Sequence, residues 1–154
     1  MIVEMRDANL YGALSEERLQ AFEEKLGVRL PSDYREFLER YNGGTPILCG
    51  FWIREGQDGS EVHQFYGLHD GPTWASLDCY IGPERYGIPA EMLAVGDDGV
   101  GNRICIGIKG DSRGAVFFID AEIHPYDEPD ALEGITKLAD SFARFLTNLQ
   151  GISE

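Results

Sequence analysis

The sequence has few basic residues, few cysteines and no long apolar run, and each shortage argues against a class of protein. Its 13 lysines and arginines face 27 aspartates and glutamates, which gives a formal charge of −14. A field of that sign repels phosphate backbones and anionic lipids, so we expect no direct binding to nucleic acid or to a membrane. It favours fast, salt-sensitive capture of a basic partner, with simple solubility as the alternative explanation of the same charge.

The 3 cysteines, Cys49, Cys79 and Cys105, lie far apart and form no Cys-x-x-Cys pair. An odd count with this spacing indicates reduced core residues rather than a disulfide framework. The apolar residues at 1–6 are interrupted by Glu4, which does not fit a secretory signal, and no stretch approaches the roughly 18 apolar residues of a membrane helix. The expected compartment is therefore the cytoplasm.

Sequence patterns that gather catalytic groups are scarce. No H-E-x-x-H or G-x-x-x-x-G-K-[ST] sequence occurs, and the histidines do not pair at helical spacing. The segment 97–102 superficially resembles a calcium loop, but two of its ligand positions would be Gly99 and Gly101, which carry no side-chain oxygen. We therefore predict no catalytic residue, no metal and no cofactor, and keep a small hydrolase using acids near His69 or His124 as a minority alternative.

Two helices are predicted near the start of the chain. Ser15 can cap a helix over 15–26 that ends at Gly27, since glycine tolerates the left-handed conformation of a helix stop. A second helix begins after Pro31 and ends at Asn42. Its apolar residues recur at i, i+3, i+4 and i+7, which places one largely aromatic stripe against a core: Tyr34, Phe37, Leu38 and Tyr41.

Strands are predicted in the middle of the chain. Aromatic and β-branched residues at 47–54 and 61–68 flank a glycine-containing turn and predict a hairpin. Residues 69–89 contain Pro72 and Pro83 and predict a long connection with one short helix near Leu77 to Ile81. Residues 91–120 predict a three-strand meander. Its middle strand should be covered mainly on the isoleucine face, leaving the other face more open: Arg103, Cys105, Gly107 and Lys109.

The chain then carries its most concentrated acid at 120–133, followed by an apolar periodicity that predicts one helix over 135–149, ended by Gly151. The order of helices, strands and a last helix is typical of an α+β fold. We expect a single domain over 1–154, with an antiparallel or mixed β-sheet of about five to six strands on which the N-terminal helices and the C-terminal helix pack.

Two segments resemble a known family. The sequence LGVRLPSDYREFLERYNGG at 26–44 resembles the signature of the SUKH superfamily, specifically its Smi/Knr cell-wall-regulator-like branch, in which a short helix begins after Leu-Pro and ends at Asn-Gly-Gly. Residues 94–120 are similar to the later block of that family, with an Asp-Gly-x-Gly-Asn turn between apolar strands. The signature residues are assigned a structural role: Leu30, Pro31, Tyr34, Phe37, Asn42, Gly43 and Gly44.

The resemblance implies an α+β protein without enzymatic activity, which in bacteria is usually an immunity protein that binds and blocks a contact-delivered or polymorphic toxin. Many members of the family meet nucleases, and a basic toxin of that kind would suit the acidic charge of this chain. Some fungal relatives are regulatory scaffolds, so a binding module with an endogenous protein partner stays open as the alternative. Nothing in the sequence decides the oligomeric state.

Charge and expected exposure predict where the partner binds. The surface would combine the turn of the first hairpin, the glycine-rich turn of the meander and the acidic run, with one tryptophan as the anchor. The expected partner-binding residues are Trp52, Glu55, Asp58, Glu61, Asp97, Asp98, Asn102, Glu122, Asp127, Glu128 and Asp130.

Overall fold

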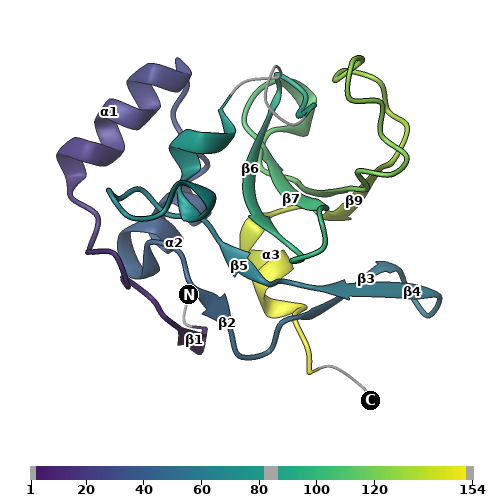
Figure 1. Ribbon diagram of the computed structural model, residues 1–154, viewed down its shortest axis with the longest axis horizontal. Helices are drawn as coiled ribbons and strands as arrows, with labels where there is room; N and C mark the ends of the chain where they lie inside the picture. Colours follow the sequence, from purple (N-terminus) through teal and green to yellow (C-terminus); the bar gives the residue numbers. More distant parts are fainter. Residues whose placement is uncertain (1–2, 82–86, 152–154) are drawn as a thin grey trace.

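The structure is a computed structural model that describes residues 3–81 and 87–151. Figure 1 shows two helices on one side of the molecule, a curved sheet in the middle and a long hairpin projecting from the opposite side. The helices are α1 (Glu16–Leu26), α2 (Ser32–Tyr41) and α3 (Phe142–Thr147), with short 3₁₀ turns η1 (Thr73–Ala75), η2 (Leu77–Tyr80) and η3 (Gly110–Ser112). No helix within these described ranges is long and apolar enough to cross a membrane.

The main sheet is antiparallel and has the order β5-β6-β7-β8-β9. Its strands are β5 (Gln64–Phe65), β6 (Met92–Asp97), β7 (Arg103–Gly107), β8 (Val116–Ile119) and β9 (Ile135–Ala139). Two smaller antiparallel pairs join β1 (Met5–Arg6) to β2 (Thr45–Pro46) and β3 (Gly50–Arg54) to β4 (Asp58–Glu61). The predicted α+β class and the three-strand meander are confirmed.

Both predicted N-terminal helices form where their caps place them. Ser15 Oγ accepts a hydrogen bond from the Arg18 N–H at 3.2 Å, and Gly27 ends α1 with φ of 78°. Asn42 ends α2 in the same left-handed region, with φ of 44°. The Arg35 guanidinium lies 2.7 Å from a Glu16 carboxylate oxygen and therefore ties α2 to α1.

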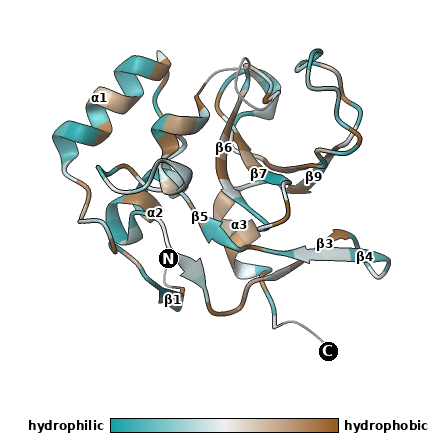
Figure 2. Cartoon of the chain, viewed as in Figure 1, coloured by the Kyte–Doolittle hydropathy of each residue, from teal (hydrophilic) through white to brown (hydrophobic). Residues whose placement is uncertain are grey.

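The core is an aromatic cluster between α2, α3 and the sheet. Phe37 of α2, Phe65 of β5 and Phe142 of α3 are buried, and Phe37 meets the other two rings edge to face with centroids 5.1 and 5.0 Å apart. Burying each such side chain stabilises the fold by about 1.5–3 kcal/mol. Figure 2 shows the same division, with apolar residues along β6 and β7 and mostly polar residues along α1 and the loop before β9.

The prediction that β7 is covered mainly on one face is wrong. Cys105, on the face opposite the isoleucines, is completely buried, and Gly107 is buried as well. The connection between β5 and β6 covers this face, because Tyr80 of η2 lies under the Arg103 guanidinium at 5.3 Å. The predicted short helix of that connection is confirmed as η2, and Pro83 lies outside the described residues.

The predicted helix over 135–149 is also wrong in its first half. Residues Ile135–Ala139 form β9, which pairs with β8, and only Phe142–Thr147 are helical. The apolar periodicity that predicted one helix is shared between a strand and a helix. Ser141 marks the boundary, since its Oγ accepts a hydrogen bond from the Arg144 N–H at 3.1 Å and caps α3.

The predicted hairpin forms but is shorter than expected. Its second strand is β4, which ends at Glu61, whereas residues Gln64–Phe65 leave the hairpin and join β6 as β5. Ile47 and Leu48, expected in the first strand, precede β3 and are about half exposed. A strand spanning 61–68 is therefore replaced by two short strands in different sheets.

The Asn-Gly-Gly segment joins α2 to the start of the sheet. The Asn42 side-chain amide donates to Gly12 O and to Leu68 O, both at 2.9 Å, and its Oδ1 accepts from the Leu68 N–H at 2.8 Å. The backbone of Arg6 passes so close to Gly44 that a Cβ on Gly44 would lie 2.7 Å from Arg6 O. We call Asn42 with its partners the Asn42 brace, and its contacts are those of a structural role.

Candidate functional site

Three segments carry the predicted partner-binding residues, and the structure connects them in a row. They are the hairpin (50–61), the tip (97–102) between β6 and β7, and the acidic loop (120–133) between β8 and β9. Ser60 Oγ donates to Asp98 Oδ2 at 3.3 Å, which joins hairpin to tip. Asn102 Oδ1 accepts from the Ala121 N–H at 2.9 Å, which joins tip to acidic loop.

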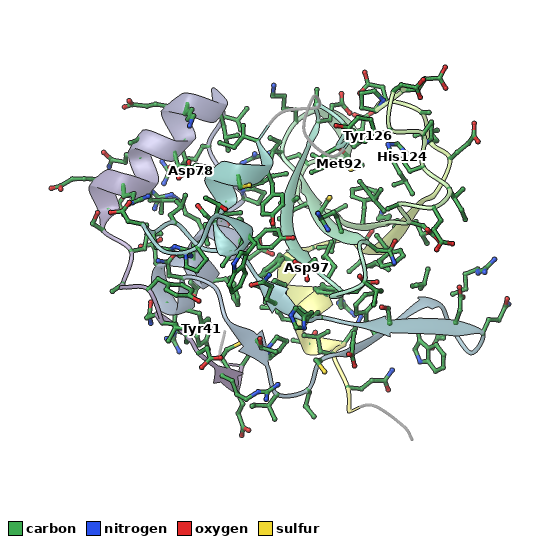
Figure 3. All side chains as sticks on the ribbon, viewed as in Figure 1. Tyr41, Asp78, Met92, Asp97, His124 and Tyr126 are labelled. Atoms are coloured by element: carbon green, nitrogen blue, oxygen red, sulfur yellow. The ribbon has the colours of Figure 1, made fainter. Side chains whose placement is uncertain are left out.

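The hairpin and the far end of the acidic loop do not share one surface. In Figure 1 the hairpin projects at the lower right, whereas the acidic loop rises at the upper right. Figure 3 places His124 and Tyr126 in this upper region and Asp97 near the centre. The tip therefore separates two exposed regions, the hairpin and the acidic loop, that were predicted to form one surface.

The tip carboxylates are buried, so the expectation that they are exposed is wrong. Asp97 and Asp98 are only 8% and 6% exposed. Asp98 Oδ1 accepts from the backbone N–H groups of Val100 and Asn102 at 3.0 and 3.1 Å. Asp97 Oδ2 accepts from Tyr66 OH at 2.8 Å, and burial, reinforced by this negative charge, raises the pKa of Tyr66. These carboxylates hold the turn together instead of facing a partner.

The hairpin presents Trp52 together with exposed acidic side chains. The Trp52 side chain is 45% exposed and lies against Gly59, whose missing Cβ would sit 3.4 Å from the indole. Glu55 and Glu61 are exposed. Asp58 instead forms an ion pair with Arg54 at 3.0 Å, and a hydrogen bond from Arg54 lowers the pKa of Asp58. Of the predicted hairpin residues, Trp52, Glu55 and Glu61 are therefore exposed and take part in no ion pair within the described part of the chain.

The acidic loop is exposed as predicted and contains apolar residues that sequence reasoning missed. Its four predicted carboxylates are all exposed: Glu122, Asp127, Glu128 and Asp130. No ion pair found among the described residues involves any of them. Ile123, Tyr126 and Leu132 are 60%, 67% and 82% exposed. Large apolar side chains in an acidic segment without strand or helix were the available signal for this mixed surface.

The histidines of the hydrolase alternative bond to backbone groups. His69 Nε2 lies 3.0 Å from Ala75 O, and its Nδ1 accepts from the Gly71 N–H at 3.0 Å. Burial lowers the pKa of His69. His124 places Nδ1 and Nε2 each 2.9 Å from a carbonyl oxygen, of Glu133 and of Gly87. Both rings are thus held by backbone carbonyls and amides, and no carboxylate of the described residues is found bonded to either.

Residues 110–114, G-D-S-R-G, match the G-x-S-x-G pattern of serine hydrolases. The prediction of no catalytic residue overlooked this match. In those enzymes the serine stands on a sharp turn from a strand into a helix, within reach of a histidine. Here Ser112 lies in η3 between two strands, and its Oγ donates to Lys109 O at 3.1 Å. The letters match the pattern, but the local structure does not.

Other reactive groups are not gathered into a site. Burial raises the pKa of the Cys105 thiol to about 12 and also raises that of Cys49. Within residues 3–81 and 87–151, no three histidine, cysteine or carboxylate side chains come together as metal ligands would. The exposed residues of the hairpin and of the acidic loop are therefore the best candidates for function, and their chemistry is that of binding.

The sequence is similar to known proteins over nearly its whole length. It matches the SMI1 / KNR4 family (SUKH-1) over residues 13–148, a range that includes the hairpin, the tip and the acidic loop. The SPbeta prophage-derived uncharacterized protein YokK of Bacillus subtilis (strain 168) is 27% identical over 163 residues, which cover 93% of this chain and 79% of the relative.

Proposed function

The chain belongs to the SMI1 / KNR4 family (SUKH-1), and from that premise we propose that it is an immunity protein that acts in the cytoplasm. It binds a basic toxin domain and covers the toxin's active site, without a reaction of its own. The prophage origin of its relative YokK fits a gene carried for competition between bacteria. The observation that carries the proposal is the acidic loop, where carboxylates that form no ion pair with another described residue surround exposed apolar side chains.

The acidic loop supplies two contributions to binding. Its carboxylates raise the rate at which a basic partner arrives, because charges of opposite sign steer the encounter. Its apolar residues Ile123, Tyr126 and Leu132 then provide the surface that can be desolvated against the partner, with Tyr126 suited to anchor it. A nuclease cleft that accepts phosphates would accept carboxylates in the same positions.

Growth protection tests this function. The toxin domain encoded in the reading frame beside this gene would be expressed in a sensitive bacterium, alone and together with this chain. We expect growth to stop with the domain alone and to be restored by co-expression. A neighbouring domain that stays toxic, or that forms no complex with the purified chain, would contradict the proposal.

A charge-matched pair of variants locates the interface. Replacing Glu122, Asp127, Glu128 and Asp130 by their amides removes four charges from the acidic loop. The control replaces four exposed acids on the N-terminal side that form no ion pair among the described residues: Glu4, Asp7, Glu17 and Glu24. Protection that weakens in the first variant and persists in the second would support binding through the loop.

A further inference from the structure

The strand β3 has an edge at Trp52 that pairs with no other strand of the described residues. Cys49 O accepts from the Val62 N–H at 2.8 Å, so Cys49 faces the β4 side. Gly50 faces the other way, since its N–H and C=O bond to Gln150 O and N at 2.7 and 2.9 Å. Backbone groups alternate in direction along an antiparallel strand, so Trp52 points its N–H and C=O away from β4, as Gly50 does.

At Trp52 no segment continues the pairing that Gln150 begins. Residues 142–148 form α3 and its cap, and the bridge to β3 found in the described chain is that of Gln150 to Gly50. Within residues 3–81 and 87–151 no hydrogen bond to the Trp52 backbone is found outside the β3–β4 pairing. An exposed edge of this kind is a template for another strand.

A groove of about 400 Å³ runs beside this edge. It lies between β3 and β9 and is lined by the apolar Ile53 and Leu138, by the buried Phe51 and Phe145, and by the polar Glu55, Lys137, Asn148 and Gln150. An extended peptide needs this combination, with backbone partners along one side and apolar contacts for alternate side chains.

The charges around the edge select a basic peptide. Glu55 lines the groove, is exposed and takes part in none of the ion pairs of the described residues. The nearby cations Arg54 and Lys137 are each offset by an aspartate, Asp58 and Asp140. The uncompensated charge beside Trp52 is therefore negative.

We propose that the β3 edge at Trp52 accepts an extended, basic segment of the partner toxin by β-strand addition. The segment's backbone would bond the Trp52 N–H and C=O, its apolar side chains would enter the groove, and a basic side chain would face Glu55, which lines the groove. This inference rests on the proposed function for the identity of the partner. It adds a second contact region to the acidic loop.

Two substitutions at one position separate the indole from the backbone. Trp52→Ala removes the side chain and keeps the N–H, whereas Trp52→Pro removes both, at a site where the N–H has no partner within the described part of the fold. Trp74→Ala is the matched control, because that indole is 57% exposed but lies away from the hairpin. Binding of the neighbouring toxin domain would be measured by titration calorimetry.

We expect Trp52→Ala to weaken binding roughly tenfold, Trp52→Pro to weaken it about fivefold further, and Trp74→Ala to leave it unchanged.

Hydrogen exchange on the wild-type complex checks the same claim without a variant, and the Trp52 amide should become protected on binding. A complex without this protection, or with equal affinities for the two Trp52 variants, overturns strand addition and leaves the proposed function standing. Protection that appears in the chain alone as its concentration rises would assign the edge to a second copy and overturn the inference. No complex at all overturns the proposed function together with this inference.

Discussion

The Asn42 brace and the β3 edge are opposite cases of how a chain treats its backbone hydrogen bonds. At the brace, one side chain satisfies Gly12 O, Leu68 O and the Leu68 N–H, all within 2.9 Å. At the edge, Trp52 keeps its backbone groups unbonded to any neighbouring segment of the described chain. The first arrangement leaves nothing to offer a partner, and the second leaves a donor and an acceptor in place for one.

The ion pairs also differ between two regions of the molecule, the helical side and the acidic loop. On the helical side, the Arg35 guanidinium contacts Glu16, Glu23 and Glu39, so these three acids share one cation. In the acidic loop the described residues provide no such partner. Isolated surface ion pairs contribute about 1 kcal/mol or less, so the loop forgoes little stability. Under the proposed function, stability and recognition occupy different parts of this fold, and the acids of one part are not interchangeable with those of the other.

The largest expected effect comes from breaking the brace. A Cβ at Gly67 would lie 2.3 Å from Asn42 O, so Gly67→Ala must displace backbone. We expect it to lower the free energy of unfolding by about 3 kcal/mol, the upper end of the usual range for overpacking. Gly151→Ala is the control, because a Cβ there has nothing within 4 Å. Equal urea midpoints for the two variants would contradict the role given to the brace.

A smaller effect should appear on acidification, again on the helical side. Burial lowers the pKa of His69, so the folded chain binds its proton less readily than the unfolded chain does. The resulting stability is fully present above the ordinary histidine pKa of about 6.5 and is lost as pH falls through the lower folded value. His69→Gln removes this contribution.

Urea unfolding at pH 7.5 and at pH 5.5 measures this contribution of His69 to stability. The wild type should lose more stability between the two pH values than His69→Gln does, because only the wild type must protonate a ring whose Nδ1 accepts from the Gly71 N–H. Comparing the two proteins cancels the contributions of the other titrating groups to the pH dependence, because both proteins contain those groups. Identical pH dependence would show that His69 is not held in its neutral form by the fold.

Features decided by neighbouring residues could be predicted from the sequence. Ser15, Gly27 and Asn42 act on backbone groups within a turn or two of themselves, and both helices formed between them. The meander followed from its glycine turns in the same way. Asp98 belongs to this class too, because a carboxylate that accepts from N–H groups two and four residues later is common turn chemistry. The charge of Asp98, taken alone, had predicted an exposed side chain.

Features decided by distant partners could not be predicted. Ile135 and Leu138 fit a helical period as well as a strand, and only the pairing with β8 makes Ile135–Ala139 a strand. The free edge at Trp52 likewise depends on Gln150, almost a hundred residues away in the sequence, covering Gly50 and no more. The separation of the hairpin from the acidic loop is also a consequence of the assembled sheet. A sequence pattern contains none of these pairings.

The rate of association with the neighbouring toxin domain, measured against salt concentration, tests the central claim most directly. At low salt the acidic-loop variant with four amides should associate roughly tenfold more slowly than wild type, and its rate should depend less on salt. The control variant at Glu4, Asp7, Glu17 and Glu24 should stay close to wild type. Equal rates for the two charge-matched variants would contradict the account, since recognition would then depend on total charge and not on the acidic loop.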